Sequence, residues 1–315
     1  MRPIILLALI LALPATAEFS FQDDGQALTV LENNQPALVY RYGIVAPPER
    51  VDAKFRRACY IHPLYGLDAE VMTQDFPIDH RHHRGIFWAW PKSTVGGKPA
   101  DVWTLEGIRQ VHDAFLERTA DVASAVVSVQ NRWAYDDAPD QATVRETVRF
   151  VVHPADNKGR AIDFELTFEN MSSEETVISG SEAEDKGVTK GYGGFCFRPD
   201  ATRSPMTFTA LNGVEEKDAL SLETPWCDVS FPIKKGSEKM SGVAIFQHPR
   251  NPGYPHPGWI LRHYGFLGAS WPHTEPYALA PGASVTLRYR MWVHRGNATE
   301  AGVPAAFEAY SAAAP

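Results

Sequence analysis

The sequence contains little cysteine, and the cysteines it has form no recognisable pair. Its three cysteines, Cys59, Cys196 and Cys227, lie far apart and show no CxxC spacing. An odd number of widely spaced cysteines argues against a disulfide framework, although a single disulfide stays open in an oxidising compartment. We therefore expect small buried thiols.

Basic residues are outnumbered by acidic ones. The chain has 30 Lys and Arg against 38 Asp and Glu, which gives a net charge of −8. Binding to the phosphates of a nucleic acid needs a basic surface. The charge balance therefore argues against nucleic acid as a partner.

Long hydrophobic runs are absent after the first seventeen residues. That leader, MRPIILLALILALPATA, has one positive charge at Arg2, an apolar core over Ile4–Leu13 and small residues at its end. This is the layout of a secretory signal peptide, with cleavage expected before Glu18. The apolar core is too short to span a bilayer comfortably. We therefore expect residues 1–17 to be a signal peptide, no integral membrane association, and a secreted or periplasmic bacterial protein.

Motifs for nucleotide binding and for self-sufficient catalysis are also missing. The chain has no GxGxxG, no P-loop, no GxSxG, no HExxH and no Cys/His pair of defined spacing. It has no alternation of strands and helices of the βαβ kind either. No reaction can therefore be assigned from a motif alone, and no cofactor is predicted, with a divalent metal left open.

Strand patterns occupy nearly the whole chain. Short segments alternate apolar and polar residues and are separated by Gly, Pro, Asn and Asp. These segments are FSFQ, ALTVLE, ALVYRYG, SAVVSVQNRWAY, TVRETVRFVVHP, RAIDFELTFEN, ETVISGSE, MTFTALNG, GVAIFQHP and SVTLRYRMWVHRG. An amphipathic helix is expected chiefly around residues 299–313. The pattern predicts an all-β fold, a large antiparallel β-sandwich with little helix. No linker or repeat divides the chain, so we expect a single domain over residues 18–315.

Four longer segments, rich in aromatic residues and proline, interrupt the strand pattern. They cover residues 57–105, 184–205, 223–240 and 248–276. Loops on a rigid sheet scaffold are where binding and catalytic residues usually lie. We expect these segments to form loops that gather at one face of the sandwich.

The segment FPIDHRHHRGIFWAW, residues 76–90, concentrates three of the chain's 11 histidines: His80, His82 and His83. In an extended segment His80 and His82 would share one face, and such a pair can chelate a metal. The neighbouring arginines disfavour a cation, so we favour a wall of hydrogen-bond donors that contacts substrate. A polar turn packed under the aromatic run is the third interpretation.

A second segment, SEAEDKGVTKGYGGFCFRPD, places charged residues before a glycine-rich turn and Arg198 after it. Glycine permits close backbone approach, and arginine can bind a carboxylate or diol with two parallel hydrogen bonds. A charged surface hairpin is the alternative interpretation.

A third segment, residues 242–266, contains His248, Asn251, Trp259 and Arg262 in a loop stiffened by prolines. Aromatic rings stack on the apolar faces of a sugar while polar groups bind its hydroxyls. Trp226 in TPWCDVSF would add another ring. Alternatively, both tryptophans belong to the core.

Glycoside hydrolysis commonly uses two carboxylates that flank the scissile bond. Nothing in the sequence pairs the available acids, which are Glu106, Glu146, Glu182, Asp185 and Asp228. We interpret Glu146 in TVRETVRF as an outward-facing partner of a cross-strand arginine.

Several of these segments together resemble the PmoA-like family of secreted bacterial proteins, over about residues 30–297. The DHxHHRG block, the HPxNPxxP block and the terminal GxxxxLRYRxxVH strand carry the resemblance most specifically. The resemblance implies a supersandwich similar to those of galactose mutarotase and glycoside hydrolases, and no catalytic assignment. Family positions present here are His80, His83, Arg84, Arg198, His248, Asn251 and Arg290.

The leading hypothesis is a secreted carbohydrate-active enzyme, a hydrolase, lyase or epimerase, that acts on a glycoside or a uronate-containing saccharide. Its candidate catalytic residues are His80, His83, Glu106 and Glu182. Its candidate substrate-binding residues are His82, Arg84, Lys190, Tyr192, Arg198, Trp226, His248, Asn251, Trp259 and Arg262. The alternatives are a non-catalytic carbohydrate-binding protein, and a copper or zinc protein with His80, His82 and His248 as ligands.

Overall fold

The computed structural model describes residues 18–313. The signal peptide expected over residues 1–17 lies outside the described residues. Among residues 18–313, no helix is long and apolar enough to cross a membrane.

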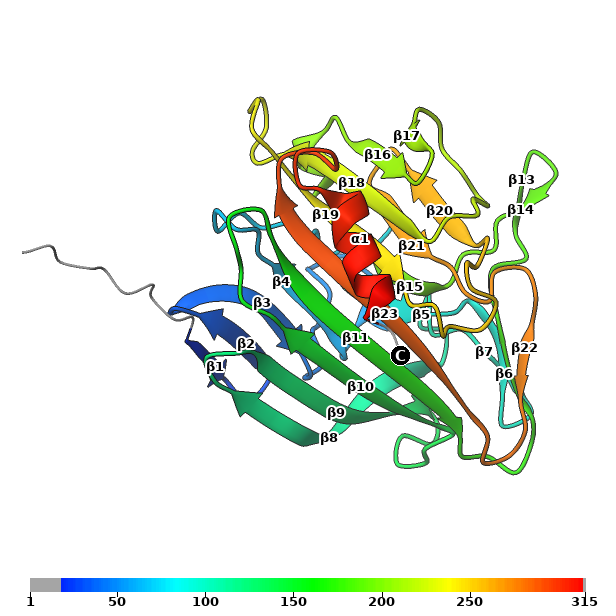
Figure 1. The fold of residues 1–315 in the computed structure, drawn as a ribbon. Coiled ribbons are helices and arrows are strands. Elements are labelled where there is room, and N and C mark those ends of the chain that lie inside the picture. The colour runs from blue at the N-terminus through cyan, green and yellow to red at the C-terminus, as the bar shows by residue number, and fades with distance from the viewer. Residues whose placement is uncertain (1–17, 314–315) are drawn as a thin grey trace, which may run out of the picture.

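Two large antiparallel sheets make up most of the structure (Figure 1). The eight-stranded sheet has the order β1 (Phe19–Asp23), β2 (Ala27–Glu32), β3 (Gln35–Arg41), β4 (Tyr60–Leu64), β5 (Ile86–Ala89), β15 (Gly194–Phe197), β21 (Phe266–Ala269) and β20 (Trp259–Arg262). The nine-stranded sheet has the order β17 (Gly213–Glu215), β16 (Thr207–Ala210), β18 (Trp226–Pro232), β19 (Met240–Gln247), β23 (Ser284–Arg295), β11 (Gly159–Asn170), β10 (Val144–Val152), β9 (Ala125–Tyr135) and β8 (Ile108–Ala120).

Smaller elements complete the described chain. A four-stranded sheet has the order β22 (Tyr277–Leu279), β12 (Thr176–Ser179), β6 (Lys92–Val95) and β7 (Lys98–Ala100), and β13 (Glu184–Asp185) pairs with β14 (Val188–Thr189) in a hairpin. Two 3-10 turns, Ala53–Phe55 and Ala201–Arg203, and helix α1 (Val303–Ala312) are the helical elements described.

The two large sheets pack face to face because alternate residues of their strands are apolar. Buried and partly exposed residues alternate along β11, so that Phe164 points inwards between two acidic residues. The Phe164 ring lies 5.1 Å from Phe195 of the eight-stranded sheet, and Phe195 stacks on Tyr289 of β23 at 4.7 Å. One hydrophobic cluster therefore joins both sheets. The predicted antiparallel β-sandwich is confirmed.

Strand β8 was not visible in the sequence. Its pairing with β9 shifts register twice, between His112 and Ala114 and again between Phe115 and Glu117. Each shift moves the following side chains relative to the sheet faces, so the apolar residues do not alternate regularly. An irregular edge strand of this kind lacks the period of two on which strand prediction depends.

The predicted C-terminal helix is present and packs on the outer face of the nine-stranded sheet (Figure 1). Gly302, with a φ of 65°, precedes α1, and Pro304 lies in its first turn, where proline is tolerated. Val303 and Tyr310 of the helix bury themselves against Trp226 and Phe246 of the sheet in a second hydrophobic cluster.

The four segments expected as loops contain buried strands, so that expectation is wrong in part. Strands β5, β15, β18 and β21 lie within them, one in each, and every residue of these strands is buried. A strand covered on both faces has no alternation, and the sequence pattern cannot distinguish it from other apolar runs. The expected buried thiols are confirmed, because Cys59, Cys196 and Cys227 are all free and buried.

Candidate active site

A cleft opens on the outer face of the eight-stranded sheet. Phe195 points into the core, where it stacks on Tyr289. On β5, Trp88 pairs with Phe195 and points to the same face. Successive residues of a strand point to opposite faces, so the preceding residue, Phe87, faces outwards. The Phe87 ring lies 5.7 Å from His83 and 5.3 Å from Trp103. The floor of the cleft is therefore formed over β5.

The cleft has a volume of about 410 Å³, within the range of roughly 300–1,000 Å³ that is usual for small-molecule sites. It is lined by His80, His82, His83, Pro91, Trp103, Thr104, Ser181, Ala183, Lys190, Tyr192, Arg262 and Tyr264. Three of the four segments expected to gather at one face thus meet here, and residues 223–240 do not. The sequence-predicted residues that the fold brings together are His80, His82, His83, Lys190, Tyr192 and Arg262.

The histidine segment forms a tight turn instead of the extended segment considered for it. The His83 N–H donates to the His80 carbonyl at 2.9 Å. Gly85 follows with a φ of 52°, and a Cβ there would lie 2.1 Å from the Ile61 carbonyl oxygen, so only glycine fits. Because the turn redirects the side chains, the His80 and His83 rings stack in parallel at 4.7 Å and His82 meets His83 edge-on at 4.5 Å.

Asp79 joins His80 to Arg198 at the edge of the cleft. His80 Nδ1 lies 3.0 Å from one Asp79 oxygen, and Arg198 Nη2 donates to both Asp79 oxygens at 2.9 and 3.1 Å. Burial raises the pKa of Asp79, but the His80 contact and the Arg198 guanidinium outweigh it and lower that pKa overall. Nδ1 has no partner of hydrogen-bond geometry among the described residues, but the negative charge of Asp79 at this distance favours the tautomer with the proton on Nδ1, which leaves Nε2 as a proton acceptor.

His82 and His83 are uncharged at neutral pH. Burial, followed by repulsion from His80 and Arg57, lowers the pKa of His82 to about 3. Burial also lowers the pKa of His83 well below its ordinary value. Arg198 Nη1 donates to His83 Nδ1 at 3.5 Å, so the proton of His83 lies on Nε2. Arg198 itself is only 1% exposed and lies behind the histidines, outside the lining of the cleft, which corrects its prediction as a substrate-binding residue.

Two tyrosines provide protonated hydroxyls beside the histidines. The Tyr264 ring is parallel to His80 at 4.8 Å, and Tyr192 lines the same cleft. Burial raises the pKa of both tyrosines. They keep their protons at neutral pH and can act as proton donors.

Two cations line the cleft directly. Arg262 is held by Asp218 at 3.1 Å and by Asp185 at 3.7 Å. Lys190 also lines the cleft and has no ion pair with any residue from 18 to 313. Its charge is therefore available to a ligand.

Arg57 adds a buried cation beneath Trp103. It is 1% exposed, and its Nη2 donates to the carbonyls of Val102 and Trp103 at 2.7 and 2.9 Å. Its Nε and Nη1 have no hydrogen-bond partner among the described residues. Burial, followed by repulsion from Arg84, lowers the pKa of Arg57 to about 9, so it stays charged at neutral pH. A buried cation without a carboxylate partner favours a negatively charged ligand nearby.

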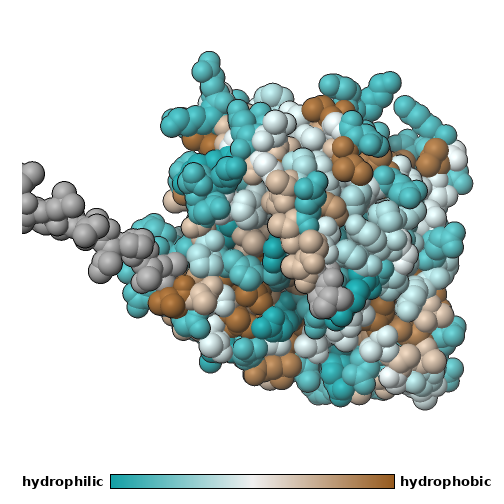
Figure 2. Space-filling model, viewed as in Figure 1, coloured by the Kyte–Doolittle hydropathy of each residue, from teal (hydrophilic) through white to brown (hydrophobic). Residues whose placement is uncertain are grey.

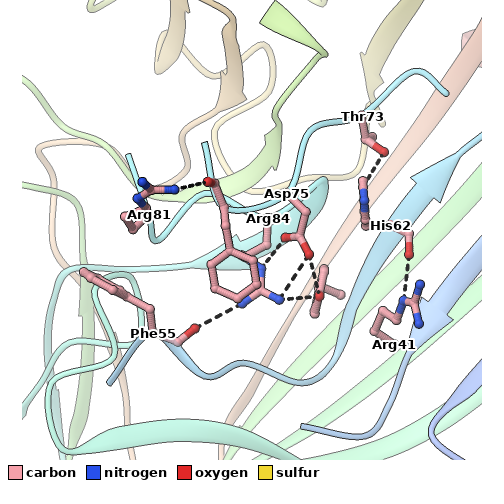
Figure 3. A network of polar contacts seen from close by, with 9 residues as sticks. Arg41, Phe55, His62, Thr73, Asp75, Arg81 and Arg84 are labelled. Atoms are coloured by element: carbon pink, nitrogen blue, oxygen red, sulfur yellow. Dashed lines mark hydrogen bonds and ion pairs between the residues drawn. The ribbon is translucent and has the colours of Figure 1, made fainter. Parts of the chain in front are cut away.

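Arg84 lies outside the cleft, which corrects its prediction as a substrate-binding residue. Figure 3 shows it at the centre of a polar network. Its side chain is fully buried, forms an ion pair with Asp75, and donates to the Phe55 carbonyl at 3.0 Å and to the Tyr60 hydroxyl. The guanidinium lies 3.5 Å from the centre of the Phe76 ring. Arg84 therefore fastens the histidine turn to its surroundings.

The two tryptophans predicted to stack on a sugar belong to the core. Trp259 is fully buried, and its indole N–H donates to the Thr224 carbonyl at 2.6 Å. Trp226 is 2% exposed and packs under α1. Both lie on strands, where the hydrophobic effect buries them, and neither ring is accessible to a ligand.

His248 and Asn251 lie away from the cleft and line other hollows of the molecule. The set His80, His82 and His248 is therefore not assembled as a metal site. Among residues 18–313, no group of three His, Cys, Asp or Glu side chains is placed to hold a metal ion. The fold separates the two blocks because they extend from different sheets.

Within residues 18–313, no pair of carboxylates lines the cleft. Glu106 pairs with Lys54, and Glu182 is exposed at the rim, where it pairs with Lys92 at 2.8 Å. Glu146, interpreted as outward-facing, is fully buried and accepts hydrogen bonds from Gln110, Asn131 and Trp133 at 2.8 to 3.0 Å. The assignment of Glu106 and Glu182 as catalytic residues finds no geometric support.

Sequence reasoning missed Trp103, Tyr264 and Arg57. Trp103 and Tyr264 lie in two of the four aromatic-rich segments, residues 57–105 and 248–276, where nothing in the sequence favoured one ring over another. Arg57 had no signal, because only the structure shows that its charge is buried without a carboxylate.

Folding stability is expected to fall as the pH decreases from 6.5 toward 4. Burial lowers the folded-state pKa of His82 to about 3 and that of His256 to about 4, below the value of 6.5 for free histidine. Within that window the unfolded chain binds more protons, so each histidine contributes a slope of up to about 1.4 kcal/mol per pH unit. The contribution is complete above pH 6.5. Urea denaturation across this window measures the slope, and His82→Asn should reduce it; an unchanged slope would contradict the expectation.

One protein family has a sequence profile that matches residues 27–308, and it is described as a family of unknown function (DUF6807). All residues that line the cleft lie within this range. The PmoA label expected from the motifs is not part of that description. A comparison with curated proteins found no match.

Solved structures with a similar chain path include three with names that refer to sugars. An alpha-galactosidase from Lactobacillus brevis has a TM-score of 0.43 and 10% identity, covering 90% of this chain and 39% of its own. A candidate kojibiose phosphorylase from the human microbiome has a TM-score of 0.38 and 7% identity, covering 88% and 32%. A candidate aldose 1-epimerase from Klebsiella pneumoniae has a TM-score of 0.38 and 10% identity, covering 95% and 88%. This chain thus spans well under half the length of the first two proteins, and likenesses at this level do not indicate its activity.

Proposed function

The chain belongs to this family of unknown function (DUF6807), and from its own cleft we propose that it is a carbohydrate-active enzyme that abstracts a proton beside the carboxylate of a uronate-containing saccharide. We also propose that it acts after export, because residues 1–17 have the layout of a signal peptide. The observation that carries the proposal is an Asp79-oriented histidine in a cleft with surplus positive charge and no pair of carboxylates.

The charge of the cleft supports an anionic substrate. Lys190 has no ion pair among the described residues, and Arg57 is buried without a carboxylate. Arg262 adds a third cation that its aspartates already hold in place. A uronate carboxylate bound here would be neutralised, which lowers the energy of the negative charge that develops when the adjacent C–H bond breaks.

His80 is the proposed general base. The acceptor nitrogen of neutral His80 is Nε2, because the negative charge of Asp79 beside Nδ1 favours the proton on Nδ1. Nε2 takes the proton from the carbon beside the carboxylate, and the imidazolium formed is stabilised by Asp79. Asp79 and Arg198 are positioning residues, because they act through His80.

Tyr264 is the proposed general acid. In elimination the electrons of the broken C–H bond form a carbon–carbon double bond, the glycosidic C–O bond breaks, and the departing oxygen takes the Tyr264 proton. Because the Tyr264 and His80 rings stack side by side, both reach one face of the sugar, so the geometry favours elimination over epimerisation, which needs a donor on the opposite face. The elimination needs no oxidant or further reactant. The parallel contact between Tyr264 and His80 places donor and acceptor on adjacent rings.

Incubating the protein with uronate-containing and neutral oligosaccharides in D₂O tests the proposal. We expect deuterium at the carbon beside the carboxylate, or an unsaturated uronate with its ultraviolet absorbance, from the uronate substrates alone. Lys190→Gln should lower kcat/KM about 10- to 100-fold, the scale of one hydrogen bond to a charged group. Lys98→Gln, which removes an exposed lysine outside the cleft, is the matched control. Turnover of neutral glycans at an equal rate would contradict the proposal, and uronate binding without exchange would identify a binding protein.

A further inference from the structure

A second hollow lies on the outer face of the nine-stranded sheet, beside α1. Its volume is about 240 Å³, and its polar lining comes from β10, β11, β23, the loop after β19 and the helix. Figure 2 shows hydrophilic residues in teal around the C-terminal end of α1 on this face. The hollow is separate from the first cleft, since the two open on different sheets of the sandwich.

The HPRN sequence builds one wall of the hollow. The Asn251 N–H donates to the His248 carbonyl at 2.9 Å, which closes a turn. The Asn251 side chain then binds the backbone of Arg288 twice, donating to its carbonyl at 2.7 Å and accepting from its N–H at 2.7 Å. This double contact clamps the turn to β23 and fixes where His248 and Arg250 lie.

Two buried polar side chains have groups available to a ligand. His248 is 7% exposed, and its Nδ1 accepts from the Arg250 N–H at 3.1 Å. Burial lowers the pKa of His248, so the ring is neutral and its proton lies on Nε2. Tyr310 is 8% exposed, and its hydroxyl forms no hydrogen bond within residues 18–313. Tyr310 is held edge-on by His248 at 5.6 Å and flat against Arg290 at 4.6 Å.

Positive charge is in surplus around these donors. Both acids in the hollow are neutralised: Asp163 by Arg290 at 2.6 and 2.7 Å, and Glu165 by Arg288 at 2.8 Å. Arg250 has no ion pair within the described part of the chain. Arg149 has only a long contact of 3.7 Å with Glu117. The hollow therefore offers N–H and O–H donors and positive charge, and lacks a free acceptor of its own.

We propose that this hollow is a second ligand site that binds an oxyanion, as a free anion or as the sulfate or carboxylate group of an acidic saccharide. Arg250 and Arg149 supply the charge, while His248 Nε2–H and the Tyr310 hydroxyl donate hydrogen bonds to the oxygens. Its volume suits one sugar residue or one small anion better than a large cofactor. The proposal stands on these residues and holds whatever reaction the first cleft performs.

Calorimetric titration with inorganic sulfate, glucuronate and glucose tests this site. We expect saturable binding of sulfate or glucuronate and none of glucose. Tighter binding of glucuronate than of sulfate assigns a saccharide ligand, and the reverse assigns a free anion. Arg250→Ala should weaken binding about tenfold or more, and Tyr310→Phe should weaken it by a smaller factor.

Two further variants separate the two sites. Lys190→Gln weakens uronate binding in the first cleft, so titrations of this variant report the second hollow, where sulfate and glucuronate binding should persist. Arg118→Ala removes an exposed arginine on β8 as a charge control. Binding that survives Arg250→Ala but is lost in Lys190→Gln would place the anion in the first cleft and overturn the proposal. The absence of saturable anion binding to the unaltered protein would overturn it as well.

Discussion

Replacing His80 by glutamine is expected to lower the turnover number on a uronate substrate by about 10²- to 10⁴-fold, the usual contribution of a general base. Glutamine retains a polar side chain but cannot accept a proton at neutral pH. The His80 side chain is 34% exposed, so its loss removes little buried surface and should leave the fold intact. Steady-state kinetics and a thermal melt on the same preparation measure the two effects.

A matched control is available at His153. This histidine is 35% exposed and lies 2.7 Å from Asp163, so like His80 it is partly exposed and has an aspartate partner, but it lies directly after β10 of the nine-stranded sheet. His153→Gln should leave turnover within about twofold of the original. If His80→Gln and His153→Gln had equal activity, His80 would not be the base.

Asp79→Asn should produce a loss similar to that of His80→Gln, because the proton would no longer be held on Nδ1. The two substitutions affect one proton transfer, so their combination should cost little more than either alone. Additive losses would show that Asp79 acts independently of His80.

Removing the Asp228 carboxylate is expected to destabilise the fold by about 3–5 kcal/mol, the cost of breaking a buried pair. Asp228 on β18 and His294 on β23 are completely buried, with 2.7 Å between the Asp228 oxygen and His294 Nε2. The Ser230 hydroxyl donates to the other oxygen at 2.6 Å. In Asp228→Ala both groups lose their partner where water does not reach. Since proteins are stable by about 5–15 kcal/mol in total, this is a large fraction.

Chemical denaturation of three variants tests this expectation. Asp68→Asn breaks an exposed pair with Arg295, the residue after His294, and should cost at most about 1 kcal/mol. Asp228→Asn should cost less than Asp228→Ala, because its amide still offers one acceptor to His294 and one donor to Ser230. Equal stability of the Asp68 and Asp228 variants would show that the buried pair contributes little.

The close packing of strands around the Asp228–His294 pair also explains why residue 242 is a glycine. A Cβ on Gly242, between the two strands, would lie 2.5 Å from a carbon of the His294 ring and 2.9 Å from the Ser230 hydroxyl. The pair therefore needs glycine at this position, a requirement that arises from packing since its φ is not positive. None of this was visible in the sequence, where Asp228 was one of several unpaired acids.

Strands with one solvent-facing side and one buried side could be predicted from the sequence. Strand β10 alternates buried and less buried residues along its whole length, β11 and β23 do so along most of theirs, and the segments of all three were identified. Strands β5 and β15 are buried on both faces and lack that signal. Whether a strand is covered on its second face depends on which loops pack over it, and that is not a local property.

The three histidines of the dense segment line the cleft. The sequence alone could not show which arginine contacts the histidine turn from behind and which lies elsewhere. Arg84 follows the histidines directly but turns away, because Asp75 and Tyr60 hold it behind the turn. Arg198 is 119 positions from Asp79 and still reaches it. Closeness in the sequence therefore pointed to Arg84, whereas the arginine that contacts Asp79 of the turn is Arg198.

By itself the sequence determined the all-β class, the acidic net charge and the histidine cluster, because each follows from composition or from the local alternation of side chains. The tertiary structure alone decided that Tyr264 and Trp103 join that cluster, that Trp226 and Trp259 are core residues, and that His248 belongs to a second hollow. The physical reason is that strand pairing brings distant segments together, and the burial and charge around a side chain are set by those distant neighbours.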